Sequence, residues 1–280
     1  MITLYRGGSL QRYVAADFLL AREGIFTLKR LFGFCLPSLQ LPCELRGLPS
    51  LFTPSVALET SLCPPGPSYH LLTPQTPLST IFDPARLYQY LIAGNGVFVL
   101  ARSRDVETCL PLATGSLPGL VSCAPWLRFL HPQVPPPLVE DLFARARAAC
   151  LDGPQERLFY LLRDGDWRVD AGWRLFEPPQ EATEWSVQAN HATPESFTAV
   201  LEGHSHHRAA AFFSPGDDAS ELGNGGLRLF FVLGRIFEQP EIRVRLCVHG
   251  YAWRLPASLV FELPAGVHDA LPDASWEGER

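Results

Sequence analysis

The chain has 280 residues, of which 47% are hydrophobic, so it can bury the core of one large domain or two modest ones. Its net charge is −6 and its lysines and arginines do not cluster, which argues against nucleic acid as a main partner. No segment approaches the roughly eighteen uninterrupted apolar residues of a membrane-spanning helix, so no membrane contact is expected.

The seven cysteines are odd in number and widely spaced, and none of them forms a C-x-x-C pair. Neither a disulfide framework nor a cysteine-based zinc site is therefore expected. The N-terminal residues lack an apolar segment behind a basic start, which is untypical of a secretory signal. These features favour a cytoplasmic location.

Residues 1–130 are expected to form a smaller, irregular α+β domain. The first 80 residues mix frequent prolines with too much apolar content for disorder. The following segment, "DPARLYQYLIAGNG", predicts a short helix that has Asp83 as its N-cap and ends at 94–96. Residues 97–103 and 108–113 predict two paired strands. The proline-rich segment 131–137 is the predicted domain boundary.

Residues 136–270 form the second predicted domain. Residues 138–150 predict a helix with one apolar stripe, followed by a strand, a turn at Asp164 and Gly165, and a second strand that ends at 169. Residues 197–206 predict a strand that ends in histidines. Three further strands are predicted at the following positions: 227–236, 241–250 and 258–263. This order of elements predicts an α/β or α+β fold.

The most informative segment is 201–221, "LEGHSHHRAAAFFSPGDDASE". His204 and His206 are two positions apart at a predicted strand end, so both side chains are expected on one face. Ser214 is a good N-cap for a helix that starts at Pro215, and this helix would hold Asp217 in its first turn. Two imidazoles and a carboxylate form a three-ligand zinc set whose fourth position stays open, as in catalytic sites.

Each of these residues also has an ordinary structural explanation. Histidines occur in polar surface loops, capping alone explains Ser214, and a carboxylate such as Asp217 complements any helix N-terminus. The residues occur together in one pattern: His-Ser-His, a gap of seven residues, Ser, a gap of two residues, and Asp. This combined spacing favours a functional site over the separate structural explanations.

This spacing resembles the signature of the JAMM (JAB/MPN+) zinc metalloproteases, with His204, Ser205, His206, Ser214 and Asp217 at its fixed positions. The resemblance covers roughly residues 136–263. It implies a JAB/MPN-like, cytidine-deaminase-like domain with a mixed sheet flanked by helices. It also implies one Zn²⁺ per chain, bound by His204, His206 and Asp217.

The family pattern further requires an acidic residue on an earlier strand, which acts as general base. Glu156 matches best, because it follows the predicted 138–150 helix and opens the next predicted strand. Glu202 is an alternative, although it is expected to point off the face of His204. Glu181 and Glu184 are weaker alternatives in a loop-like segment.

The resemblance has two departures. His207 stands where the family often has proline, and Phe159 and Tyr160 stand where its acid-bearing strand is often rich in glycine. Ser205 and His207 alternate to the face opposite the ligands, so Ser205 is expected to be structural and His207 is not expected to be a ligand. Ser214 is expected to donate a hydrogen bond to the developing oxyanion.

The substrate implied by the resemblance is an amide bond at the C-terminus of a ubiquitin-like protein, in a conjugate or a precursor. A narrower resemblance, carried by "LIAGNGVFVLARS" and "GLRLFFVLGRI", is to the protein A family of the bacterial ParB-related, ThiF-related (PRTRC) cassette of plasmids and other mobile elements. It implies a bacterial host and an E1-like ThiF-family partner. Two different functions stay open: a catalytically inactive JAB-fold scaffold, and a hydrolase of another bond, such as a phosphodiester, which the acidic chain disfavours.

Overall fold

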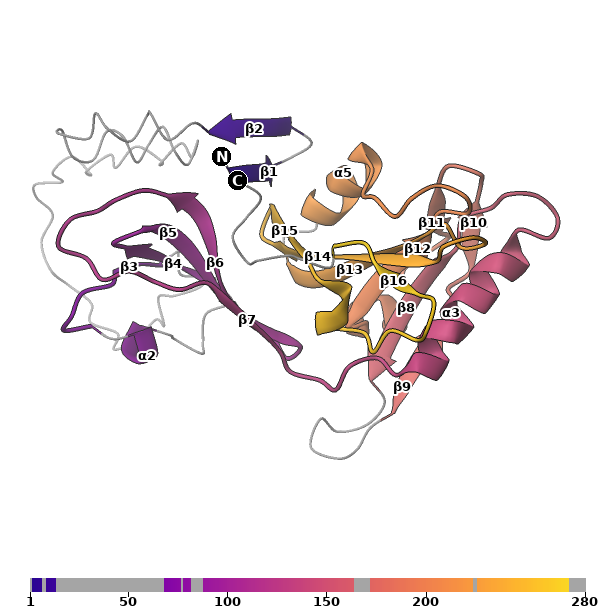
Figure 1. Cartoon of the computed structure of the whole chain (residues 1–280), viewed down its shortest axis with the longest axis horizontal. Coiled ribbons are helices and arrows are strands. Elements are labelled where there is room, and N and C mark those ends of the chain that lie inside the picture. Colours follow the sequence, from indigo (N-terminus) through magenta and orange to yellow (C-terminus); the bar gives the residue numbers. More distant parts are fainter. Residues whose placement is uncertain are drawn as a thin grey trace, which may run out of the picture.

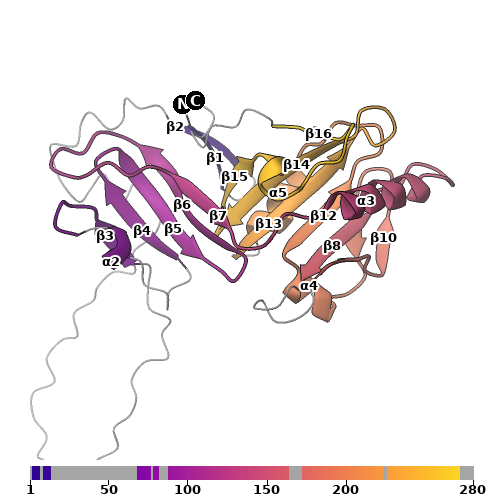
Figure 2. The ribbon, with the colours of Figure 1, turned by 60° about the horizontal axis from the view of Figure 1, so that its bottom comes forward.

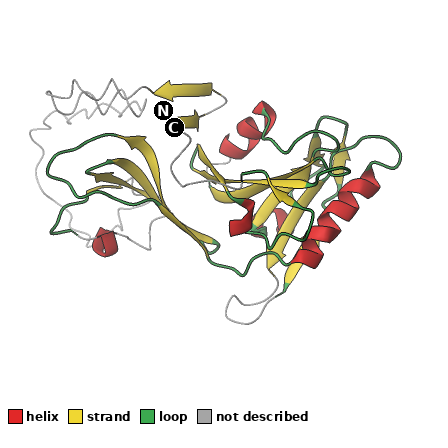
Figure 3. Ribbon diagram, viewed as in Figure 1, coloured by secondary structure: helices red, strands yellow, loops and turns green. Residues whose placement is uncertain are grey.

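The computed structural model describes residues 2–6, 9–13, 68–76, 78–81, 88–163, 172–223 and 226–271. In these ranges the protein is α+β, with sheets that mix parallel and antiparallel strands (Figures 1 and 3). The coarse fold class predicted from sequence is confirmed. Most of the packing predicted for the first 80 residues lies outside the described residues. So do the turn at Asp164 and Gly165 and the strand predicted after it.

A five-stranded sheet precedes the predicted boundary, and its strands follow the order β3-β4-β5-β6-β7. All its neighbours are antiparallel except β3 and β4. Its elements are β3 (Ser68–Leu71), α2 (Leu78–Ile81), β4 (Tyr88–Ala93), β5 (Gly96–Arg102), β6 (Val106–Thr114) and β7 (Trp126–Phe129). The predicted strand pair at 97–103 and 108–113 is confirmed as β5 and β6. A separate antiparallel pair consists of β1 (Ile2–Arg6) and β2 (Ser9–Tyr13).

The helix predicted before position 94 is wrong, because its described part is strand β4. Ala93 pairs with Gly96 across a two-residue turn, and Gly96 has φ of +145°, a conformation that only glycine adopts readily. The side chain of Asn95 exchanges two hydrogen bonds of 2.8 Å with the backbone of Cys123. Pairing with β5 therefore outweighs the helix-capping signal of the sequence.

A seven-stranded mixed sheet follows the boundary, in the order β15-β14-β13-β12-β8-β9, with β16 beside β14. Only the β12–β13 and β14–β16 pairs are parallel. Its strands are β8 (Leu158–Arg163), β9 (Trp173–Phe176), β12 (Leu201–Ser205), β13 (Leu227–Gly234), β14 (Glu241–Val248), β15 (Tyr251–Leu255) and β16 (His268–Asp269). A small hairpin of β10 (Gln180–Ala182) and β11 (Val187–Ala189) forms a separate two-stranded sheet that packs against β8.

The predictions for this part of the chain are mostly confirmed. Strands β8, β13 and β14 lie at predicted positions. The strand predicted from 197 starts only at Leu201, because 197 and 198 belong to the short helix α4 (Pro194–Thr198). The strand predicted at 258–263 is wrong: the segment starts in the 3-10 helix η2 (Ala257–Leu259) and keeps a single bridge, between Phe261 and Val134.

Helices cover both faces of the seven-stranded sheet. Helix α3 (Pro136–Ala149) buries its apolar stripe in the cluster that contains Phe231 of β13. Helix α5 (Pro215–Gly223) contributes Leu222 to a second cluster, around Phe230. Because side chains alternate along a strand, Phe230 and Phe231 face opposite sides, and so do the two helices.

The two large sheets lie side by side (Figures 1 and 2). One buried cluster contains Val99 and Leu110 of the five-stranded sheet together with Trp253 and Leu255 of the seven-stranded sheet. The indole Nε1 of Trp253 donates a hydrogen bond of 3.1 Å to the carbonyl of Pro111. The chain segments on either side of the 131–137 boundary thus share a core. No helix within the described ranges has the length and apolar character needed to cross a membrane.

Gly203 allows β12 to approach β13 closely. A Cβ atom at this position would lie 2.4 Å from the carbonyl oxygen of Phe231 and 2.5 Å from its ring. We expect Gly203→Ala to lower the free energy of unfolding by about 1–3 kcal/mol, because the backbone must shift to relieve the overlap.

Urea unfolding measures this change in the free energy of unfolding. Gly172→Ala is the control, since nothing lies within 4 Å there, and it should stay within about 0.5 kcal/mol of wild type. Equal effects at both positions would contradict this account.

Candidate metal centre

The centre lies where β12 ends and α5 begins. Parallel neighbours such as β12 and β13 need a crossover connection, and here α5 lies within it. The carboxyl end of the first strand and the amino end of the crossover helix are a common place for ligands in sheets with parallel strands. This topology brings His204 and His206, at the end of β12, to the first turn of α5.

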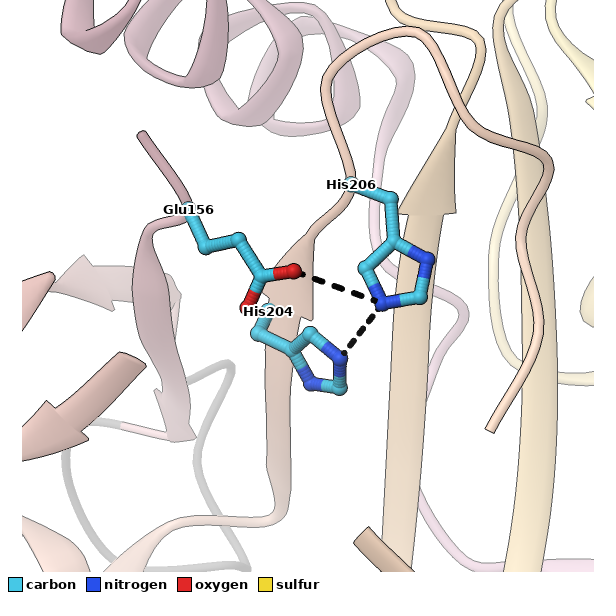
Figure 4. Close-up of side chains that lie close together, drawn as sticks. All are labelled: Glu156, His204 and His206. Atoms are coloured by element: carbon cyan, nitrogen blue, oxygen red, sulfur yellow. Dashed lines mark hydrogen bonds and ion pairs between the residues drawn. The ribbon is translucent and has the colours of Figure 1, made fainter. Parts of the chain in front are cut away.

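The two predicted histidine ligands lie against each other. The exposed fractions of His204 and His206 are 8% and 5%, and their Nε2 atoms are 3.1 Å apart (Figure 4). Two nitrogens bound to one tetrahedral zinc at 2.0–2.1 Å are separated by about 3.3 Å, so the pair fits one ion. The Nδ1 of His206 lies 3.2 Å from the carbonyl of Ala210. This contact requires a protonated Nδ1 and leaves Nε2 as the metal-binding atom.

Ser214 and Asp217 form a reciprocal cap at the start of α5, as the sequence predicts. The Asp217 amide donates to Ser214 Oγ at 3.2 Å, and the Ser214 amide donates to Asp217 Oδ2 at 2.6 Å. The other carboxylate oxygen of Asp217, Oδ1, is 3.7 Å from His204 Nε2. Capping therefore fixes Asp217 so that one oxygen faces the histidines.

Glu156 reaches the histidines from the segment just before β8. Its amide donates to the carbonyl of Thr183 at 2.9 Å, and its Oε1 lies 3.7 Å from His206 Nε2 (Figure 4). Only 7% of the residue is exposed. The predicted general base is thus a buried carboxyl group beside the two imidazoles.

Within the described residues, these side chains form two overlapping sets that could hold a metal ion. Glu156, His204 and His206 make one set, and His204, Asp217 and Glu221 make the other. The predicted ligands His204, His206 and Asp217 are divided between the two sets. Sequence reasoning missed Glu221, although its position four residues after Asp217 places both on one face of α5.

Two neighbouring residues point away from the centre, as expected. Ser205 is fully buried on the other face of β12, where its Oγ accepts a hydrogen bond of 3.0 Å from the amide of Arg157. The Nε2 of His207 contacts the carbonyl of Glu184 at 2.7 Å. Neither residue belongs to a potential ligand set among the described residues.

The expectation that Glu202 points off the face of His204 is wrong. The two residues are two positions apart on β12, so their side chains share a face of the sheet. Glu202 instead forms an ion pair with Arg228, whose Nη2 lies 3.3 Å from Oε2. Among the described residues it belongs to neither of the two potential ligand sets. Glu181 and Glu184, the two weaker candidates for the general base, are exposed on the β10–β11 hairpin.

Burial shifts the pKa values of the two histidines and of Glu156, and the shifts of the histidines favour cation binding by the imidazoles. Burial lowers the pKa of His204 to about 4, and it also lowers the pKa of His206, so both rings are neutral at pH 7 and can bind metal without losing a proton. Burial, together with the charge of Asp217, raises the pKa of Glu156 to about 8. Neutral imidazoles faced by carboxyl groups fit the donor set that zinc takes in proteins.

The shifted pKa of Glu156 predicts a pH dependence of the metal-free protein. The folded state holds this proton up to about pH 8, whereas the unfolded chain releases it near the ordinary value of 4.5. Stability contributed by the proton is therefore complete below pH 4.5 and is lost as the pH rises to 8. We expect Glu156→Gln to gain thermal stability over wild type progressively from pH 5 to pH 8 in the presence of chelator. A difference in melting temperature that stays constant with pH would contradict the shift.

No protein-family model matches the chain, and no curated protein matches it significantly. A functional assignment therefore depends on the spacing of the residues and on the geometry of the centre.

Proposed function

We propose that this centre is a zinc site of a JAMM-type peptidase that hydrolyses an amide bond at the C-terminus of a ubiquitin-like protein. The observation that carries the proposal is the position of His204 Nε2 at the end of β12, 3.1 Å from His206 Nε2 and 3.7 Å from Asp217 Oδ1. Glu156 Oε1 lies 3.7 Å from His206 Nε2. Zinc bound in a site of this kind polarises a carbonyl group and lowers the pKa of water to about 7.

Glu156 serves as general base in this proposal. It is buried next to the histidines, and its raised pKa of about 8 in the metal-free protein lies close to a neutral working pH. It accepts a proton from the attacking water and returns it to the leaving amine. The neutral histidines would hold the cation, and Asp217, whose Oδ1 lies 3.7 Å from His204 Nε2, would supply negative charge to it.

Ser214 serves as hydrogen-bond donor to the developing oxyanion. Its Oγ accepts from the amide of Asp217, which leaves the hydroxyl hydrogen free to donate. A donor of this kind contributes about 2.7–4 kcal/mol to transition-state stabilisation. Capping and catalysis are thus compatible at one hydroxyl group.

The substrate class rests on the sequence resemblance, and one structural feature supports it. Trp185, at the tip of the β10–β11 hairpin, is 76% exposed, and its ring stands edge-on to His207 with centroids 6.2 Å apart. An exposed aromatic side chain on the hairpin whose Thr183 carbonyl accepts the Glu156 amide suits an extended polypeptide tail, which can also pair with strand edges. The proposed partners are a ubiquitin-like protein and an E1-like ThiF-family protein of a bacterial cassette.

The test is to incubate the purified protein with a ubiquitin-like protein that carries a C-terminal extension. Mass spectrometry should find cleavage after the ubiquitin-like C-terminus, loss of cleavage with chelator, and recovery with added zinc. Protein carrying Glu156→Gln, purified identically, controls for contaminating proteases. An intact substrate, or cleavage that chelator does not affect, would contradict the proposal.

A second candidate function is an inactive scaffold in a ubiquitin-like conjugation system. It is favoured by the grouping of Glu156 with both histidines, since a glutamate that binds the ion directly is no longer free to act as base. A scaffold would bind zinc and a partner without cleaving it. Zinc content measured together with the cleavage activity of wild type and Glu156→Gln distinguishes the two functions, because a scaffold cleaves nothing before or after the change.

A further inference from the structure

A buried arginine holds the helix that carries Asp217. Arg245 of β14 is 3% exposed; its Nε donates to Glu221 Oε2 at 2.6 Å, and its Nη1 donates to Asp218 Oδ1. Its guanidinium carbon lies 3.9 Å from the ring centroid of Phe213, just before α5. These partners lie on both sides of Asp217 in the sequence, so Arg245 fixes the part of α5 that faces the centre.

Glu221 is close enough to the centre to act as a ligand. Its carboxylate lies within 4.8 Å of the ligand atoms of both His204 and Asp217. Carboxylates are ordinary zinc ligands, and four protein ligands make a closed, structural site rather than an open, catalytic one. If Glu221 joined His204, His206 and Asp217, the position needed by water and substrate would be filled.

The contacts of Arg245 oppose this outcome. A guanidinium forms strong charge-assisted hydrogen bonds to carboxylates, and a carboxylate as little exposed as that of Glu221 gains from such a partner. We propose that Arg245 is a positioning residue that competes with the ion for the Glu221 carboxylate, so that the centre keeps three protein ligands and one open position. The inference rests on the proposed metal centre and concerns its ligand number rather than its substrate.

Cobalt is a suitable probe, because its visible spectrum changes with the number and kind of its ligands. Azide, a small anion, binds Co²⁺ only where a position is open. We expect azide to shift the visible bands of the cobalt-loaded wild-type protein. The shift should be lost in Arg245→Met, where Glu221 occupies the open position, and restored in Arg245→Met/Glu221→Gln. Glu221→Gln alone should respond like wild type. An ion pair with a purely structural role would alter stability but not this response.

Arg245→Met leaves the two partly buried carboxylates of Asp218 and Glu221 without this partner and can fail to fold. Arg245→Met/Asp218→Asn removes one of them, and this variant should also lose the azide response. A retained response in a folded variant without Arg245 would overturn the inference. So would a response that Glu221→Gln fails to restore, or a cobalt-loaded wild type that does not respond to azide.

The outcomes separate this inference from the proposed function. A wild-type protein that binds no cobalt overturns the metal centre and this inference with it. A protein that shows the predicted azide responses but cleaves no ubiquitin-like substrate overturns the peptidase function and leaves the role of Arg245 supported.

Discussion

Replacing His206 by alanine is expected to reduce bound zinc from one ion per chain to nearly none and to abolish cleavage. The change removes the nitrogen that lies 3.1 Å from His204 Nε2, and the remaining groups then lack the imidazole pair. The fold should persist, because His206 follows the last residue of β12 and lies outside the core clusters. Elemental analysis of the purified protein, after gel filtration in metal-free buffer, measures the loss.

His207→Ala is the matched control for this experiment. His207 is the next residue, is buried to a similar degree, and contacts the carbonyl of Glu184 rather than the centre. It should retain one zinc per chain. Stoichiometric zinc in His206→Ala would contradict the ligand assignment, and equal loss in both variants would indicate general disruption of the loop instead.

Replacing Glu156 by glutamine is expected to lower kcat/KM by about 10²–10⁴-fold while zinc stays bound. Glutamine keeps the shape of the side chain but cannot accept the proton from water, and general base catalysis contributes about this much. The rate is measured with a ubiquitin-like substrate at fixed zinc, and the metal content is measured on the same preparation. Zinc content that falls together with the rate would make Glu156 a ligand rather than the base. A wild-type protein that binds zinc but cleaves nothing would favour the scaffold function.

Glu202→Gln provides the comparison for this variant. Glu202 lies on the same face of β12 as His204, is also largely buried, and pairs with Arg228. We expect its replacement to change kcat/KM far less than Glu156→Gln. The opposite order of effects would transfer the role of base to Glu202.

The elements that the sequence predicts well are those whose signals are local. The cap formed by Ser214 and Asp217 involves residues three positions apart, so its hydrogen bonds depend only on the first turn of α5. The apolar stripe of α3 is also a local signal, because its buried residues recur every three or four positions in the sequence. The pairing of His204 with His206 follows from strand alternation.

The elements that the sequence does not predict depend on distant partners. Strand β4 has a helix-like start signal, but its pairing with β3 and β5 determines its conformation. Strand β15, which was not predicted, exists as the hairpin partner of β14. The ligand candidate Glu221 is recognisable only when its distance to His204 is known, and its arginine partner comes from another strand, 24 residues later.

The packing of Trp253 against Pro111 has a consequence for how the protein can be dissected. A fragment cut within 131–137 would lose the strands that cover this tryptophan and would present a broad apolar surface to water. Such a fragment is prone to self-association even if its ion-binding residues are intact. Weak turnover by an excised C-terminal half would therefore reflect its aggregation and would not by itself show a defect in the metal centre.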